Sequence, residues 1–102
     1  MRVYISGPIT GVEDYREKFK TAEEKMRAAG YEVINPAELG EVFPDLKYEE
    51  YVKLDFALID MCDAILILEG WEHSKGTDRE YHYAKAKGMK VMFNELNNRT
   101  GM

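Results

Sequence analysis

The sequence contains very few of the residues that build disulfide frameworks and metal sites. Its 102 residues include one cysteine, Cys62, and two histidines. A single cysteine cannot form an internal disulfide, and such sparse use of cysteine is typical of proteins kept in a reducing compartment. The histidines and the cysteine also lack the spacing of metal ligands, so we expect no metal and no other cofactor.

The chain also lacks an excess of positive charge and any long apolar run. It has 14 Lys and Arg against 19 Asp and Glu, which gives a net charge of -5. Binding to nucleic acids and to anionic membranes depends on basic surfaces, so we expect neither kind of partner. Without a signal-like start or a membrane-length apolar segment, the expected location is cytoplasmic.

The residues that are present fit one small globular domain. Hydrophobic residues make up 45% of the chain and charged residues 32%, enough for a single buried core. We therefore expect one domain over residues 1–102. Its polar end, residues 94–102, is either a frayed tail or an arm onto a neighbouring subunit.

Short apolar runs alternate with amphipathic stretches along the chain. The pattern predicts strands over 2–6, 31–34, 64–68 and 89–93, helices over 15–29, 48–60 and 77–87, and a loop over 40–47. Strands that alternate with helices need crossover connections, which are right-handed in nearly all cases. This predicts an α/β three-layer sandwich with a four-stranded parallel sheet, flavodoxin-like or Rossmann-like, in the order 2-1-3-4.

In that strand order the chain reverses direction between the first and third strands. Ligands of open α/β sheets bind in the crevice at such a switch point, beyond the carboxyl ends of the strands. The loops that would line this crevice are residues 6–11 and 69–77.

Glu80 is the first candidate for chemistry. It lies in the expected first turn of the third helix, behind a loop that contains Gly76 and follows a buried strand. Free backbone N–H groups and the helix dipole stabilise negative charge there, so we interpret Glu80 as a candidate nucleophile. The alternative is a glutamate that only complements the dipole, worth roughly 0.3–1 kcal/mol.

Asp55 is the second candidate, because it lies on the inward stripe of the second helix. That stripe is Tyr48, Tyr51, Val52, Phe56 and Ile59. An inward carboxyl raises its pKa or finds a partner, and a capping or salt-bridged aspartate is the alternative. Glycosidic bond cleavage uses two carboxyls, one at the sugar carbon and one that handles the proton. Glu80 suits the first role and Asp55 the second.

Tyr4 on the first strand could orient a sugar or Glu80, or it could fill the core with its hydroxyl bonded. The turn that follows contains glycines, which let the backbone approach a ligand closely. The substrate-binding candidates in this segment are Ser6, Gly7, Pro8, Ile9 and Gly11.

The second loop offers a possible phosphate site. Ser74 and the N–H groups of Gly76 and Thr77 could bind a phosphate at the helix N-terminus. Alternatively, Ser74 or Thr77 is an ordinary N-cap. Trp71 could stack on a nucleobase, or it could be a core or interface residue.

Three segments of the chain resemble the nucleoside 2-deoxyribosyltransferase-like superfamily, in particular its small phage and bacterial branch. They are residues 4–11 (YISGPITG), Asp55 ahead of residues 62–64 (CDA), and residues 70–80 (GWEHSKGTDRE) ahead of Ala84. Their order and spacing are similar to those of 2′-deoxynucleoside 5′-monophosphate N-glycosidases, and the resemblance covers nearly the whole chain.

The resemblance implies a role for each matching residue. Glu80 would attack the anomeric carbon and displace a nucleobase, Asp55 would assist base departure, and Tyr4 would help position Glu80. Ser74, six residues before Glu80, would bind a 5′-phosphate. The resemblance also implies a homodimer or larger homo-oligomer in which a neighbouring subunit helps to close the pocket.

Two departures from the family pattern leave alternatives open. Pro8 and Thr10 stand where the monophosphate hydrolases carry a serine and an arginine, so both nucleosides and 5′-monophosphates remain candidate substrates. Lys75 stands where transferases often carry an aspartate, so hydrolysis and base transfer both remain open. The sequence thus predicts an N-glycoside hydrolase or nucleoside deoxyribosyltransferase. The alternatives are a catalytically silent nucleotide-binding or regulatory module and a purely structural oligomer component.

Overall fold

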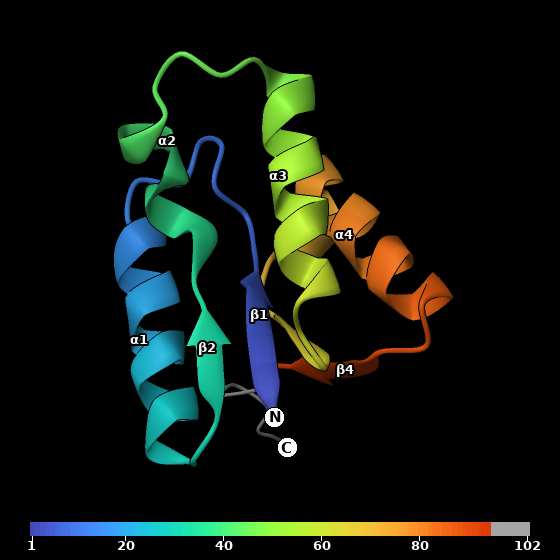
Figure 1. Ribbon diagram of the computed structural model, residues 1–102. Helices are drawn as coiled ribbons and strands as arrows, with labels where there is room; N and C mark the ends of the chain where they lie inside the picture. Colours follow the sequence, from blue (N-terminus) through green and yellow to red (C-terminus); the bar gives the residue numbers. More distant parts are fainter. Residues whose placement is uncertain (95–102) are drawn as a thin grey trace.

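The computed structural model describes residues 1–94 and has the predicted sheet (Figure 1). The strands are β1 (Arg2–Ser6), β2 (Glu32–Ile34), β3 (Ala64–Ile67) and β4 (Lys90–Phe93). Every pairing is parallel and the order is β2-β1-β3-β4, which confirms the predicted topology. The predicted tail lies outside the described residues from position 95 onward.

Helices cover both faces of this sheet, so the domain has three layers. Helix α1 (Tyr15–Ala28) covers one face, and helices α3 (Tyr48–Asp60) and α4 (Lys75–Ala86) cover the other. The α1 stripe buries Phe19 and Ala22 against the sheet, as the four-and-three spacing of its apolar residues predicts. No helix within residues 1–94 has the length and apolar character needed to cross a membrane.

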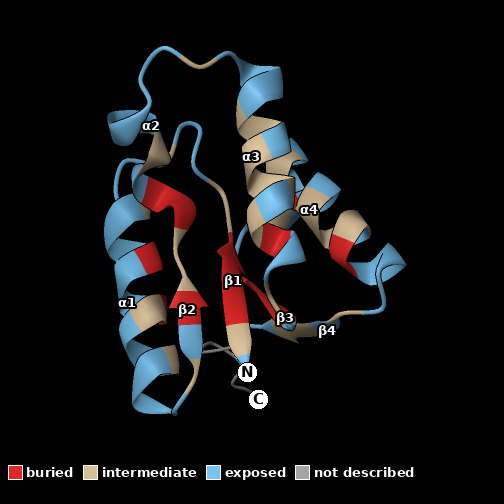
Figure 2. Cartoon of the chain, in the orientation of Figure 1, coloured by how far each residue is buried: buried red, intermediate tan, exposed pale blue. Residues whose placement is uncertain are grey.

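Side chains of each strand alternate between the two faces, as the period of two requires. The core on the α1 face contains Val3, Ile5, Phe19, Ala22, Val33, Ala37, Ala64, Leu66 and Leu68. The core on the α3/α4 face contains Tyr4, Ile59, Ile65, Ile67 and Ala84. Figure 2 shows burial concentrated on β1 and β3, the two central strands. The alternation therefore directs Tyr4 and Ser6 together toward α3 and α4.

The connection between β2 and α3 differs from the prediction. The expected loop over 40–47 begins instead with helix α2 (Leu39–Val42), which follows a 3₁₀ turn, η1 (Pro36–Glu38). Asn35 caps that turn, because its side chain accepts a hydrogen bond from the Ala37 N–H at 2.9 Å. Pro36 suits the first position of the turn, because a backbone N–H at that position would have no hydrogen-bond partner and proline has none.

Helix α4 begins two residues earlier than predicted, because Ser74 is its N-cap. Glu80 consequently lies in the second turn of the helix, and the expectation of a first-turn position near the free N–H groups is wrong. A 3₁₀ turn, η2 (Trp71–His73), precedes α4. The other strand and helix boundaries either coincide with the predicted ones, as in β1 and α3, or differ from them by one residue.

Candidate active site

Tyr4, Ser6 and Glu80 meet on the α3/α4 face of the sheet. Tyr4 Oη donates a hydrogen bond to Glu80 Oε2 at 3.2 Å, and Ser6 Oγ donates to Glu80 Oε1 at 2.5 Å. Tyr4 is 0% exposed and Ser6 1% exposed. Because the two residues are two positions apart on β1, both hydroxyls face the same helix. Each oxygen of the Glu80 carboxyl therefore has one hydroxyl donor from β1.

Asp55 reaches the same point from α3. Its carboxyl interacts with both Glu80 and Tyr4. The two carboxyls line one pocket of about 60 Å³, whose walls are Tyr48, Tyr51, Val52, Asp55, Phe56, Gly76, Arg79 and Glu80. Residues that are 25 positions apart in the sequence thus present their carboxyls to one space.

Burial controls the protonation of this cluster. It raises the pKa of Glu80 to about 8, with a further upward contribution from the charge of Asp55, while Ser6 and Tyr4 act in the opposite direction. Burial also raises the pKa of Asp55. The pKa of the Tyr4 phenol is raised well above its usual value, first by burial and then by the two carboxylates. The pair therefore holds one proton over much of the neutral range, and Tyr4 remains a donor.

Tyr48 and Arg79 join across the mouth of the pocket. Arg79 Nη1 donates to Tyr48 Oη at 2.7 Å, and its guanidinium carbon lies 5.4 Å from the centre of the Tyr48 ring. Tyr48 is 57% exposed, so its expected inward position is wrong: the N-terminus of α3 extends past the end of the sheet. Sequence reasoning did not assign either residue to the site. The available signals were that Arg79 directly precedes Glu80 and that Tyr48 lies two turns before Asp55.

The loop before α4 contributes less to the pocket than expected. Ser74 Oγ accepts a hydrogen bond from the Thr77 N–H at 3.2 Å and donates one to Thr77 Oγ1 at 3.1 Å. The Ser74 hydroxyl is therefore used as an acceptor and as a donor within the helix cap. Thr77 is 2% exposed, and Gly76 is the one member of this trio that lines the pocket. Trp71 packs against Tyr81 and Phe93, with ring centres 5.3 and 5.8 Å away.

The loop after β1 lies beside the site without lining its pocket. A Cβ atom at Gly7 would lie 2.8 Å from Leu68 Cβ, so glycine is needed there for close packing against the end of β3. Pro8 approaches Gly70 of the neighbouring loop, and Ile9 is 39% exposed. Gly11 has a φ of +78°, a conformation that favours glycine in this turn.

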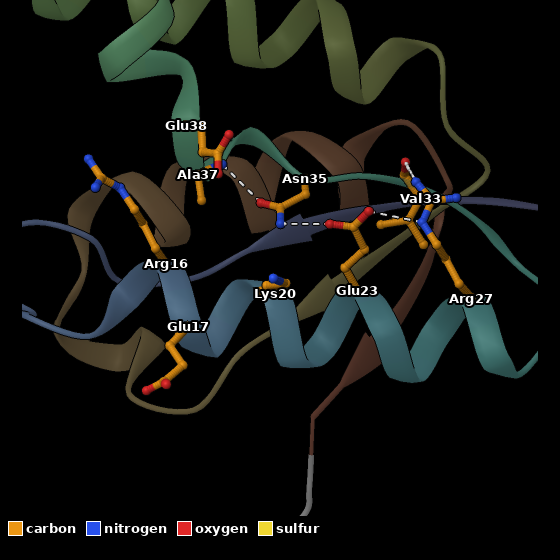
Figure 3. Close-up of a pocket in the computed structure, with 9 residues that line it drawn as sticks. All are labelled: Arg16, Glu17, Lys20, Glu23, Arg27, Val33, Asn35, Ala37 and Glu38. Atoms are coloured by element: carbon orange, nitrogen blue, oxygen red, sulfur yellow. Dashed lines mark hydrogen bonds and ion pairs between the residues drawn. The ribbon is translucent and has the colours of Figure 1, made fainter.

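A second and larger groove of about 560 Å³ lies on the other face of the sheet, between α1 and η1 (Figure 3). Glu23 is central to it: its carboxylate accepts hydrogen bonds from Asn35 at 3.0 Å and from Arg27 at 2.9 Å. The Asn35 hydrogen bond and Arg27 lower the pKa of Glu23. The charged side chains of this groove are exposed or bonded to one another, so nothing in it resembles the desolvated carboxyls of the smaller pocket.

No three His, Cys, Asp or Glu side chains within residues 1–94 gather closely enough to hold a metal ion. Cys62 is half-buried, and burial raises the pKa of its thiol to about 11. Its Sγ donates weakly to the Leu58 carbonyl oxygen at 3.5 Å, which makes it a core residue rather than a reactive thiol.

Comparison with known proteins adds two similarities. A family model described as "Domain of unknown function (DUF4406)" matches residues 1–93. A solved structure, the CMP N-glycosidase BcmB from Clostridium botulinum, is 23% identical, with a TM-score of 0.64 over 95% of this chain and 73% of that chain. At that identity the likeness shows a shared fold. No curated protein matches the chain.

Proposed function

The chain belongs to the family described as a domain of unknown function (DUF4406), and we propose that it cleaves the N-glycosidic bond of a nucleoside or nucleoside 5′-monophosphate. The observation that carries this proposal is the Glu80 carboxyl, bonded on both oxygens by β1 hydroxyls and facing Asp55 in one pocket. The fold shared with a CMP N-glycosidase supports a nucleotide among the candidate substrates.

In the proposed first step, Glu80 is the nucleophile. Its ionised carboxylate attacks the anomeric carbon of the sugar, and a new C–O bond forms as the C–N bond to the base breaks. The electron pair of the broken bond goes to the base nitrogen, which takes the proton from Asp55. Because the pKa of Glu80 is raised to about 8, the shared proton lies on Glu80 in the free protein and passes to Asp55 before the attack. The hydrogen bonds from Ser6 and Tyr4 lower the pKa of Glu80 and so favour this transfer.

In the second step, Asp55 acts as the base. It takes a proton from water, and the water oxygen attacks the anomeric carbon, breaking the ester and releasing Glu80 as a carboxylate. The overall reaction consumes one water and releases one sugar and one base. If a second nucleobase takes the place of water, the same site performs base transfer.

The substrate must enlarge the pocket in order to enter. A volume of about 60 Å³ is far below the roughly 300–1,000 Å³ of typical small-molecule pockets. Tyr48 and Arg79 are both exposed and lie on different helices, so their separation opens the mouth without disturbing the core. The predicted homodimer or larger assembly stays a prediction that sedimentation would check.

The test is release of free base from a panel of ribo- and deoxyribonucleosides and their 5′-monophosphates, followed by chromatography. Glu80→Gln keeps the size of the side chain and removes the nucleophile, so we expect at least about a thousandfold loss of kcat/KM. The matched control is Glu72→Gln, at an exposed glutamate of η2, which leaves the rate unchanged. Addition of a second free base distinguishes transfer from hydrolysis.

The outcomes separate the candidate functions. Base release that survives in Glu80→Gln contradicts the assignment of the nucleophile. Binding of a nucleotide by the wild-type protein with no base release from any member of the panel favours the catalytically silent module.

A further inference from the structure

Ser6 is an unusual residue for the end of a central strand. Within residues 1–94 the buried polar side chains are Ser6 and Thr77, and Thr77 is bonded within the α4 cap. A buried hydroxyl without a partner costs free energy, so its hydrogen-bond partner explains why it is there. For Ser6 that partner is Glu80 Oε1, at 2.5 Å.

The geometry of this contact limits what Ser6 can do. A serine hydroxyl has one proton, which it donates to Glu80, and its side chain is 1% exposed. It therefore has neither a free donor nor an open path to a ligand in the pocket. The substrate-binding role expected from the sequence stays a prediction, and the contact that the structure shows for Ser6 is with Glu80.

The two hydroxyl donors of β1 act unequally on Glu80. The bond from Ser6 to Oε1 is 2.5 Å long, whereas the bond from Tyr4 to Oε2 is 3.2 Å long. Shorter hydrogen bonds to a carboxylate are stronger, so Oε1 is held more tightly than Oε2. One firmly held oxygen fixes the plane of the carboxyl and leaves the other oxygen more available to react.

We propose that Ser6 is a positioning residue, which anchors Oε1 of Glu80, favours the ionised form of its carboxyl and orients it so that Oε2 attacks the sugar. Its role in catalysis rests on the proposed function, because it requires Glu80 to be the nucleophile. Its effect on Glu80 does not require any substrate, which allows the two ideas to be tested separately.

The surroundings of Glu80 define the expected direction of the effect. The titratable groups around it within the described residues are Tyr4 from β1 and Asp55 from α3, together with three further pocket residues, Tyr48, Tyr51 and Arg79. Burial and Asp55 raise its pKa, and the hydrogen bond from Ser6 lowers it. Removal of that bond must therefore raise the pKa further.

The experiment follows the Glu80 carboxyl by ¹³C NMR across pH, in wild type, Ser6→Ala and Ser6→Cys, with the signal assigned by its loss in Glu80→Gln. We expect the titration in Ser6→Ala to move upward by about one pH unit, the usual scale for a lost hydrogen bond to a charged group. Ser6→Cys, whose thiol is a weak donor, should lie in between. Cys62→Ala is the control and should leave the titration unchanged, because it removes a half-buried thiol bonded elsewhere.

A titration that stays at the wild-type position in a folded Ser6→Ala or Ser6→Cys protein overturns the proposal. The second variant serves if the first does not fold. If the protein releases base, the acidic limb of its kcat/KM profile should move with the carboxyl titration, with about a tenfold loss in Ser6→Ala. A shifted titration in a protein that releases no base would retain the effect of Ser6 on Glu80 and reject the glycosidase function.

Discussion

The two faces of the sheet carry their charged groups in opposite ways. On the α1 face, three basic and three acidic side chains line an open groove of about 560 Å³. On the α3/α4 face, two carboxyls share a pocket of about 60 Å³ with one arginine at its mouth. The larger groove is the less informative one, because exposed charge pairs cost and contribute little.

The two carboxyls of the smaller pocket do not stabilise the fold. Two neighbouring, partly buried carboxyls destabilise a protein unless protons or partners compensate. Glu80 and Asp55 both have raised pKa values, whereas Glu23 on the other face has a lowered one. Groups that disfavour folding and converge on one space point to function more strongly than the size of a cavity does.

After Glu80→Gln, the largest expected effect on the α3/α4 face is that of Asp55→Asn. Because the amide cannot give a proton to the departing base, kcat/KM should fall by about a hundredfold to a thousandfold. The control lies on the same helix: the Asp60 carboxylate is exposed and accepts hydrogen bonds from Tyr83 and Lys87, so Asp60→Asn should retain the rate. Equal rates for Asp55→Asn and wild type would exclude Asp55 as the proton donor.

The second effect concerns the pH dependence of stability, which has opposite signs for Glu80 on one face and Glu23 on the other. The pKa of Glu80 is raised in the folded state, so the native protein binds more protons than the unfolded chain between the ordinary pKa of 4.5 and about 8. Stability therefore falls as pH rises through that window. Glu80→Gln removes the fall and should be more stable than wild type by up to about 5 kcal/mol at pH 8.5, with little difference at pH 4.

Urea unfolding of both proteins at the two pH values measures this effect. A Glu80→Gln protein that is less stable than wild type at pH 8.5 would show that the carboxylate has a stabilising partner.

The third comparison uses two tyrosines that each donate to a carboxylate. Tyr4→Phe removes a buried donor to Glu80 and should lower kcat by about tenfold. Tyr83→Phe removes a donor to the exposed Asp60, at 2.7 Å, and should leave kcat unchanged. Steady-state kinetics at pH 7 measures both, and equal losses would indicate a general effect on the fold rather than on the site.

The fourth prediction concerns the mouth of the pocket. Tyr48→Phe removes the oxygen that accepts from Arg79, so opening costs less and KM should fall by about threefold at constant kcat. Tyr15 on the α1 face also has an arginine beside its ring, at 5.4 Å from Arg16, so Tyr15→Phe is the matched control. An unchanged KM for Tyr48→Phe would mean that this bond does not limit entry.

The smallest effect belongs to the α1 face. The pKa of Glu23 is lowered by its bond with Asn35, so it stabilises the fold above its ordinary pKa, and that contribution is lost as pH falls through its folded pKa. Glu23→Gln should therefore cost about 0.5 kcal/mol at pH 7 and almost nothing at pH 3, by urea unfolding. The rate of base release should be unaffected. A slower rate in Glu23→Gln would show that the α1 face influences the site on the α3/α4 face.

Much of the fold could be predicted because the sequence repeats its patterns with clear periods. The strand alternation that directs Tyr4 toward α4, and the spacing that directs Asp55 inward, are local properties. Boundaries were less predictable, because Ser74 and Thr77 are equally suitable caps in the sequence. The helix starts two residues earlier than predicted, which places Glu80 in its second turn rather than its first.

The sequence by itself determined the alternation of strands with helices and the two carboxyl candidates, because periodicity depends on neighbouring residues. The tertiary structure alone decided that Ser6 bonds Glu80, that Ser74 turns inward to its own helix cap, and that Tyr48 and Arg79 meet at the pocket mouth. The contacts of Ser6 with Glu80 and of Tyr48 with Arg79 join residues 74 and 31 positions apart, and they depend on how helices and strands pack, which no local pattern records. The Ser74 cap is local, but the sequence did not decide between Ser74 and Thr77 as the N-cap.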